Sequence, residues 1–111
     1  MAKHILVVLS NAVEGREEEY NDWYTNTHLR DILALPGFVS AQRFKLSDEQ
    51  LRKKGPHKYL AIYEIDGEDP KKALDALRKA IKEGMNISSA LDTDVTSWVF
   101  TPITETIVQG D

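Results

Sequence analysis

The sequence predicts an α+β fold in which four strands and two helices follow one another in the order β-α-β-β-α-β. Three observations support this prediction. Four short segments are apolar or alternate between apolar and polar residues, as strands do, and two longer segments have helical periodicity with recognisable ends. The two kinds of segment are interleaved in the order of a split βαβ unit, which forms a four-stranded antiparallel sheet.

The composition is that of an ordinary globular domain. The chain has 111 residues, which suits one domain over residues 1–111, with 41% apolar and 29% charged residues. Its net charge is −4 and its lysines and arginines are scattered, so neither nucleic acid nor a membrane is expected as a partner. The absence of cysteine excludes disulfides and thiolate chemistry. The first apolar run is too short for a signal peptide or a membrane span, which makes a cytoplasmic location the expectation.

The first half of the chain predicts a strand, a helix and a second strand. Residues 3–11, KHILVVLSN, are apolar on both faces, which indicates a strand that is covered on both sides. Residues 12–35 carry a cluster of acidic residues in their first turns and end before Pro36 and Gly37, as a helix does. Residues 37–47 then alternate with the period of two that is typical of a strand.

The second half predicts a strand, a helix and a last strand. Residues 47–57 are charged and contain glycine and proline, so we expect a mobile lid or connector before the third strand at residues 58–67. Residues 69–84 have an aspartate cap, a proline at the first helical position and a glycine after the end. Their apolar stripe predicts a purely structural helix. Residues 93–109 supply the fourth strand, broken at Pro102.

This ferredoxin-like order also predicts a homodimer. Both helices of the fold cover one face of the sheet, and the other face would expose the apolar side chains of residues 3–11 together with Leu60 and Ile62. Pairing two sheets face to face about a two-fold axis removes this exposed patch. The alternating tail after Pro102 is then expected to be an arm that reaches the partner subunit.

One face of the first predicted helix combines aromatic and polar residues where a core would be purely apolar. At 100° per residue this face consists of Tyr20, Trp23, Tyr24, Thr27, His28, Asp31 and Leu35. The histidine and the aspartate on this face are the residues that suggest chemistry.

The stretch EEYNDWYTNTHLRDILALPGFVSAQRF, residues 18–44, resembles the first helix and second strand of the dimeric α+β barrel superfamily, and it is most similar to the EthD-like branch. Trp23 and His28 on the helix and the LPGF turn at residues 35–38 carry the resemblance. Members of the superfamily include muconolactone isomerases, polyketide cyclases, cofactor-free quinol monooxygenases, haem-degrading enzymes and dye-decolorising peroxidases. The fold therefore does not select a reaction.

The resemblance implies a pocket in each subunit between the first helix and the sheet. Carried over by position, its walls would comprise Trp23, Tyr24, Thr27 and His28 from the helix, His4 and Leu6 from the first strand, and Tyr59 and Tyr63 from the third. The start KHILVV also resembles plant polyketide cyclases, whose catalytic histidine lies between the third and last strands. Residues 66–94 contain no histidine, so that particular mechanism is not expected here.

Three residues of the helix are the candidate catalytic groups. His28 would act as a general base or acid because imidazole titrates near neutral pH, and Asp31, one turn later, would orient it. Tyr24 would offer its hydroxyl to a developing oxyanion. Structural roles are the alternatives: a histidine bonded to a carbonyl, an aspartate paired with Arg43 or a helix-end amide, and a core tyrosine with a solvated hydroxyl.

The leading hypothesis is a small enzyme without a cofactor that performs acid/base chemistry of the isomerase, lyase, dehydratase or cyclase type on a hydrophobic, aromatic or lactone-like metabolite. The alternatives are a cofactor-free quinol-type monooxygenase, a non-catalytic binding protein for a hydrophobic catabolic intermediate, and a haem-handling protein. His4, His28 and Asp31 have the chemistry of a metal site, but no close ligand spacing supports one, so no metal is expected.

Overall fold

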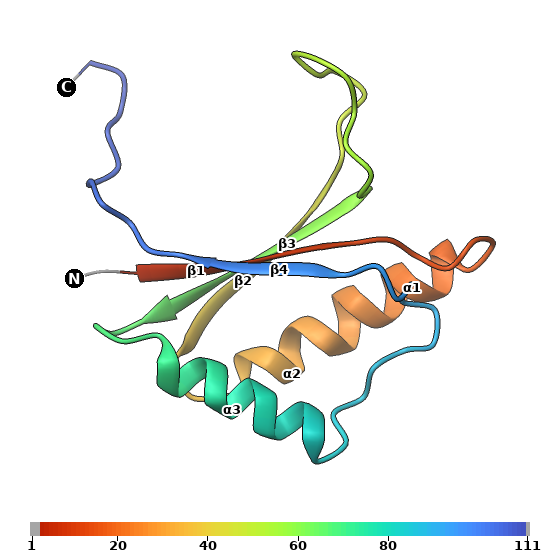
Figure 1. Cartoon of the computed structure of the whole chain (residues 1–111), viewed down its shortest axis with the longest axis horizontal. Coiled ribbons are helices and arrows are strands. Elements are labelled where there is room, and N and C mark those ends of the chain that lie inside the picture. The colour runs from red at the N-terminus through yellow and green to blue at the C-terminus, as the bar shows by residue number, and fades with distance from the viewer. Residues whose placement is uncertain (1–2, 111) are drawn as a thin grey trace.

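The predicted α+β fold is confirmed. A computed structural model describes residues 3–110; residues 1, 2 and 111 of the predicted domain lie outside the described residues. The elements are β1 (Lys3–Ser10), α1 (Glu17–Trp23), the π-helical turn η1 (Tyr24–His28), α2 (Leu29–Leu33), β2 (Phe38–Lys45), β3 (Tyr59–Asp66), α3 (Lys71–Lys82) and β4 (Thr96–Phe100). The strands form one antiparallel sheet in the order β2-β3-β1-β4, and all helices lie on one side of it (Figure 1).

Strand β1 shows how the two faces of the sheet differ. Its even-numbered side chains face the helices: Leu6 is buried and lies opposite the buried Tyr63 of β3. Its odd-numbered side chains lie on the other face, where Val7 is opposite the exposed Trp98 of β4. The apolar side chains on one face of β1 therefore lie in the covered core, and those on the other face lie on the open surface of the sheet.

The first predicted helix is interrupted by the π turn η1. It runs from Glu17 to Leu33 as two α-helical segments on either side of this turn. A π turn is wider than an α turn because its hydrogen bonds join residues i and i+5. The side chains that follow are displaced from α-helical spacing, so Ile32, which is 3% exposed, takes the inward position expected for Asp31, which is only partly buried.

Helix α3 is fixed at its start and stands away from the sheet along the rest of its length. Gly37, in the turn after α2, has φ of +93°, and a Cβ atom there would lie 2.8 Å from the Cβ of Ala73. This close approach docks the first turn of α3, where Asp69 accepts a hydrogen bond from the backbone N–H of Lys71 at 2.9 Å. Within residues 3–110, the backbone of no strand approaches α3 as closely along its length as β2 approaches α2. Space for a cavity remains beneath α3.

Two segments project from the open side of the sheet, away from the helices (Figure 1). They are residues 46–58, which connect β2 to β3, and residues 101–110, which follow β4 and form no strand. Both are largely exposed, as expected for the connector. The alternating tail was expected to be a strand-like arm, and residues 101–110 form no strand. Within residues 3–110, no helix has both the length and the apolar character needed to cross a membrane.

Candidate functional site

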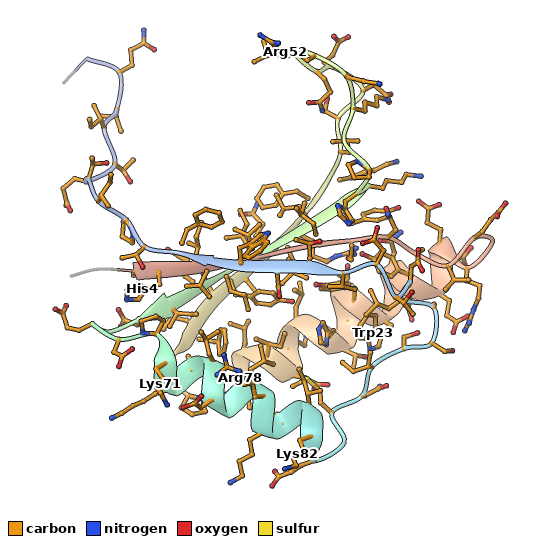
Figure 2. The ribbon with its side chains drawn as sticks, viewed as in Figure 1. His4, Trp23, Arg52, Lys71, Arg78 and Lys82 are labelled. Carbon is orange, nitrogen blue, oxygen red and sulfur yellow. The ribbon has the colours of Figure 1, made fainter. Side chains whose placement is uncertain are left out.

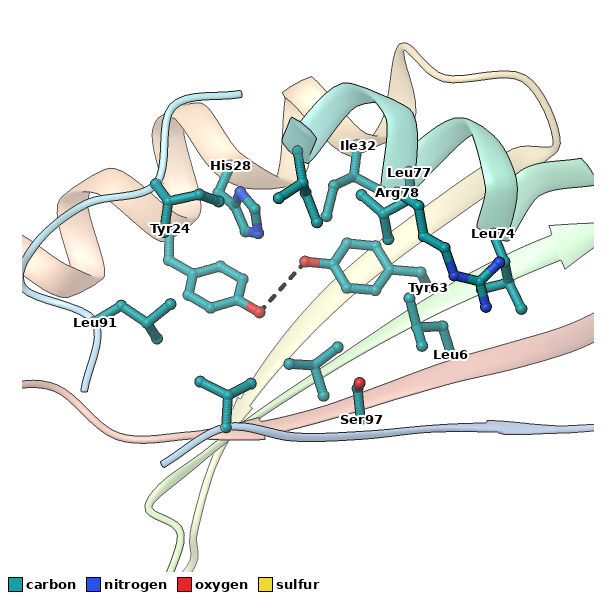
Figure 3. Close-up of a pocket in the computed structure, with 14 residues that line it drawn as sticks. Leu6, Tyr24, His28, Ile32, Tyr63, Leu74, Leu77, Arg78, Leu91 and Ser97 are labelled. Atoms are coloured by element: carbon teal, nitrogen blue, oxygen red, sulfur yellow. Dashed lines mark hydrogen bonds between the residues drawn. The ribbon is translucent and has the colours of Figure 1, made fainter. Parts of the chain in front are cut away.

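The helix side of the sheet contains a cavity of about 330 Å³ that is mostly apolar (Figure 3). Its walls come from the first helix, from α3, from strands β1, β3 and β4, and from the loop between α3 and β4. The lining residues are Leu6, Val8, Tyr24, His28, Ile32, Tyr63, Leu74, Leu77, Arg78, Ile81, Ile87, Leu91, Val95 and Ser97. The polar side chains among them are two tyrosines, one histidine, one serine and one arginine. An apolar pocket with few polar groups is typical of small-molecule sites.

His28 lies on the helical wall of this cavity among aromatic rings. His28 is 9% exposed, and its imidazole stacks on Trp23 with ring centroids 4.6 Å apart and meets the edge of Tyr24 with centroids 5.0 Å apart. Burial disfavours the charged imidazolium and lowers the pKa of His28 to about 4. The Nδ1 atom is buried and has no hydrogen-bond partner among the described residues. At neutral pH the site therefore contains an uncharged imidazole with unused hydrogen-bonding capacity.

Two tyrosine hydroxyls meet inside the cavity next to this imidazole (Figure 3). The hydroxyl of Tyr63 donates a hydrogen bond to the hydroxyl of Tyr24 at 3.4 Å. Burial raises the pKa of Tyr24 to about 12 and also moves the pKa of Tyr63 above its usual value. Both phenols thus stay protonated at neutral pH and are available as hydrogen-bond donors.

Arg43 of β2 supports Tyr24. Its guanidinium donates hydrogen bonds to Thr25 Oγ1 and Asn21 Oδ1, both at 2.9 Å. Its Cζ atom lies 4.5 Å from the centroid of the Tyr24 ring, within the range of a cation–π interaction. The positive charge partly opposes the effect of burial on the pKa of Tyr24. A cation is therefore held against one face of a cavity-lining phenol.

Asp31 does not contact the imidazole it was expected to orient. No hydrogen bond or ion pair joins it to His28 in the described part of the chain, and Arg43 is bonded to Asn21 and Thr25 instead. The negative charge of Asp31 raises the pKa of His28, but the effect of burial is larger. Asp31 therefore acts on His28 only through its charge.

Of the other expected binding residues, Leu6 and Tyr63 line the cavity, and His4, Trp23, Thr27 and Tyr59 do not. His4 lies near the start of β1 (Figure 2), where its Nδ1 is 2.9 Å from Thr101 Oγ1 and its Nε2 is 3.2 Å from the carbonyl of Glu68. Its two ring nitrogens thus have structural partners.

The two aromatic residues outside the lining have structural contacts of their own. The indole N–H of Trp23 donates to the carbonyl of Asn86 at 3.2 Å, which ties the α3–β4 loop to the first helix. The hydroxyl of Tyr59 donates to Glu17 and accepts a hydrogen bond from Asn21. Trp23 still bears on the site, because its ring is the surface on which His28 stacks.

Sequence reasoning missed the second helical wall. Leu74, Leu77 and Ile81 form the stripe that predicted a purely structural helix, and all three line the cavity. Their periodicity indicates an inward face but does not distinguish a filled core from the wall of a cavity. Arg78, which also lines the cavity, gives no signal in the sequence that separates it from the other basic residues of α3.

The candidate metal ligands are not gathered into one site. Across residues 3–110, no group of three histidine, aspartate, glutamate or cysteine side chains is arranged to hold a metal ion. His4 is bonded at the start of β1 and His28 lies in the cavity wall, so the set of His4, His28 and Asp31 is separated by the fold.

Comparisons with known proteins support the fold. The sequence model described as "Domain of unknown function (DUF4286)" matches residues 3–83, and no curated protein matches the chain. An ethyl tert-butyl ether D (EthD) family protein from Bacillus halodurans is 13% identical, with a TM-score of 0.59, over 90% of this chain and 97% of that one. A dimeric ferredoxin-like protein of unknown function from Thermobifida fusca is 14% identical, with a TM-score of 0.58, over 91% and 92%.

A third solved structure, a candidate monooxygenase from Shewanella loihica, is 17% identical, with a TM-score of 0.55, over 96% of this chain and 99% of that one. At these identities the likeness concerns the fold. The expected likeness in fold to EthD-like and dimeric ferredoxin-like proteins is confirmed.

Proposed function

This chain belongs to the DUF4286 family of domains, and we propose that it is an enzyme that performs acid/base chemistry on a hydrophobic, aromatic or lactone-like metabolite in the helix-side cavity. The observation that carries the proposal is the uncharged, partly unsatisfied imidazole of His28 on the cavity wall, next to the paired hydroxyls of Tyr24 and Tyr63. An unsatisfied buried polar atom costs about 1–3 kcal/mol, so its retention calls for an explanation.

The three side chains suit an enolisation. The neutral imidazole of His28 would accept a proton from a carbon next to a carbonyl group, and the electron pair of the broken C–H bond would move onto the carbonyl oxygen. The two tyrosine hydroxyls would donate hydrogen bonds to that oxyanion, and the imidazolium would return the proton elsewhere on the substrate. Isomerisation, elimination and cyclisation share this intermediate.

The low pKa of His28 is compatible with this role. A base whose pKa is near 4 is always unprotonated at neutral pH, but it is a weak proton acceptor. An adjacent enolate charge would stabilise the imidazolium and raise the pKa as the proton moves. We therefore expect a substrate whose C–H bond is already acidic, such as one between two carbonyl groups or next to an aromatic ketone.

The test is the His28→Ala variant. Native mass spectrometry of the freshly purified protein identifies a retained ligand, and conversion of that ligand is then followed. Loss of the base should lower kcat about 100-fold or more. His57→Ala, a histidine outside the cavity lining, is the matched control and should retain activity. Full activity of His28→Ala would refute the assignment, and a ligand that stays unchanged would favour a non-catalytic binding protein.

A cofactor-free monooxygenase is the second candidate, supported by the fold shared with the candidate monooxygenase from Shewanella loihica. Here His28 would deprotonate an electron-rich quinol, which would then react with dioxygen. Oxygen uptake with candidate quinols distinguishes this reaction from the first, because enolisation consumes no oxygen.

The protein is also proposed to be a homodimer. Trp98 and Phe100 of β4 are 61% and 55% exposed on the open face of the sheet, next to Ile5, Val7 and Leu9 of β1. An apolar surface of this kind is characteristic of an interface, and the Thermobifida fusca neighbour with the same fold is dimeric. Residues 46–58 and 101–110 rise on either side of this face and would flank a second copy bound there.

A further inference from the structure

The cavity has a buried end and an open end. The residues at the buried end are Tyr24, Tyr63, His28 and their apolar neighbours Leu6 and Ile32. The exposed lining residues are Ile81, Ile87, Val95, Ser97 and Arg78. A ligand that enters would therefore have one end among the hydroxyls and the imidazole and the other end at the mouth.

The mouth carries one formal charge. Arg78 is the charged side chain within the described lining, and Figure 2 shows it on α3 between Lys71 and Lys82. Its Nη1 donates to Asp75 Oδ1 at 2.7 Å, and the other oxygen of Asp75 lies 2.7 Å from Lys71 Nζ. Asp75 is thus shared by two cations, and Arg78 keeps most of its five N–H donors for another acceptor.

We propose that the cavity selects an amphipathic carboxylate, whose anionic group is bound by Arg78 at the mouth and whose apolar body extends toward the tyrosine pair. The guanidinium presents a planar edge that matches a carboxylate in a bidentate manner. The aliphatic walls contributed by Leu74 and Leu77 on α3 complement the apolar body of such a ligand. The inference deepens the proposed function by naming the substrate class, and it rests on this cavity being the ligand site.

The opposing explanation is that Arg78 is only a surface residue paired with Asp75. Its side chain is 69% exposed, and exposed ion pairs of this kind contribute little to stability. Two facts favour the ligand: Arg78 belongs to the cavity lining, whereas the neighbouring Lys79 does not, and the buried part of the cavity holds hydrogen-bond donors for a second polar group.

A pair of neutral and anionic ligands of equal shape tests the inference. Binding of 1-naphthylacetate and 1-naphthylacetamide to the full chain is measured by calorimetry at low salt. Wild-type protein should bind the carboxylate about tenfold more tightly than the amide. The binding free energy that corresponds to this ratio lies between the contributions of an exposed ion pair and of a hydrogen bond to a charged group. In Arg78→Gln this preference should vanish, while affinity for the amide should stay within about twofold.

Lys79→Gln is the matched control, since it removes the same charge from the same helix outside the cavity lining. It should keep the preference for the carboxylate. Equal losses in Arg78→Gln and Lys79→Gln, equal affinity of the wild type for the two ligands, or no binding of either ligand would each overturn the inference. The measurement involves no turnover, so a failure of the acid/base proposal in His28→Ala leaves its result intact, and the converse also holds.

Discussion

The two faces of the one sheet differ in what covers them. On the helix side, the first helix packs its aromatic residues onto the strands, α3 stands away from them, and the space between holds a cavity. On the other side, no element of the described chain covers the apolar side chains of β1 and β4, and two exposed segments rise around them. Incomplete packing on the helix side leaves space for the proposed ligand. The absence of packing on the open side leaves an apolar surface for the proposed partner subunit.

This difference arises from residues that alternate along the same strands. Leu6 and Val8 of β1 line the cavity, whereas Val7 between them lies opposite Trp98 on the open face. On β4, Ser97 lines the cavity and Trp98 faces away from it. Because neighbouring side chains point to opposite faces, substitutions one residue apart should act on separate properties of the protein.

The largest effect is expected from a charge on the open face. Trp98→Glu would place a carboxylate from each subunit in the proposed apolar interface. We expect the dissociation constant of the dimer to rise about 100-fold or more, because an unpaired charge in such a surface is strongly unfavourable. Sedimentation at micromolar concentration measures this change, and ligand binding in the cavity should be unaffected.

Leu33→Glu is the control for this experiment, since Leu33 is an exposed apolar residue on the helix side of the sheet. It should remain dimeric. A monomeric wild-type protein would contradict the dimer, and a Trp98→Glu variant that remains dimeric would move the interface away from the open face.

A smaller effect is expected from one hydroxyl on the covered face. Tyr24→Phe removes a proposed oxyanion donor and should reduce kcat by about 10- to 100-fold, somewhat less than for a lone donor because Tyr63 remains. Tyr59→Phe is the matched control, because it removes a hydroxyl bonded to Glu17 and Asn21 outside the cavity lining. Steady-state kinetics with the identified substrate should separate the two variants. Equal rates in both would exclude the tyrosine pair from the reaction.

The smallest predicted effect concerns stability against pH. The pKa of His28 is lowered to about 4 in the folded protein, so the unfolded chain, with its ordinary histidine pKa, binds the proton more readily. Stability should therefore fall as pH decreases from about 7 toward 4, with a loss of about 2 kcal/mol between pH 7.5 and pH 5 from this residue. Denaturant unfolding at the two pH values measures the loss.

In His28→Gln this component of the pH dependence should disappear, whereas His57→Gln should retain it. If His28→Gln loses as much stability as the wild type over the same interval, another group is responsible. The interval is chosen above the ordinary range of carboxyl pKa values, because the carboxyl groups of Glu17, Glu19 and Asp75 have lowered pKa values and lose their contributions at more acid pH.

The element order and part of the site could be predicted from the sequence. Periods of two and of about 3.6 residues are local properties, and the end signals at Pro36 and Gly84 are local as well, so the strands and helices follow from residues close together in the chain. For the same reason the inward direction of Tyr24 and His28 was predictable, and so was the apolar character of the open face.

Only the tertiary structure decided which of these residues share a cavity. The π turn places Ile32 in the inward position that was expected for Asp31, and no sequence pattern predicts this turn. The contact between Gly37 and Ala73 fixes α3 at one end and holds Leu74, Leu77 and Arg78 over the space above β1 and β3. Packing depends on distances between segments far apart in the chain, whereas periodicity records only which way each segment faces.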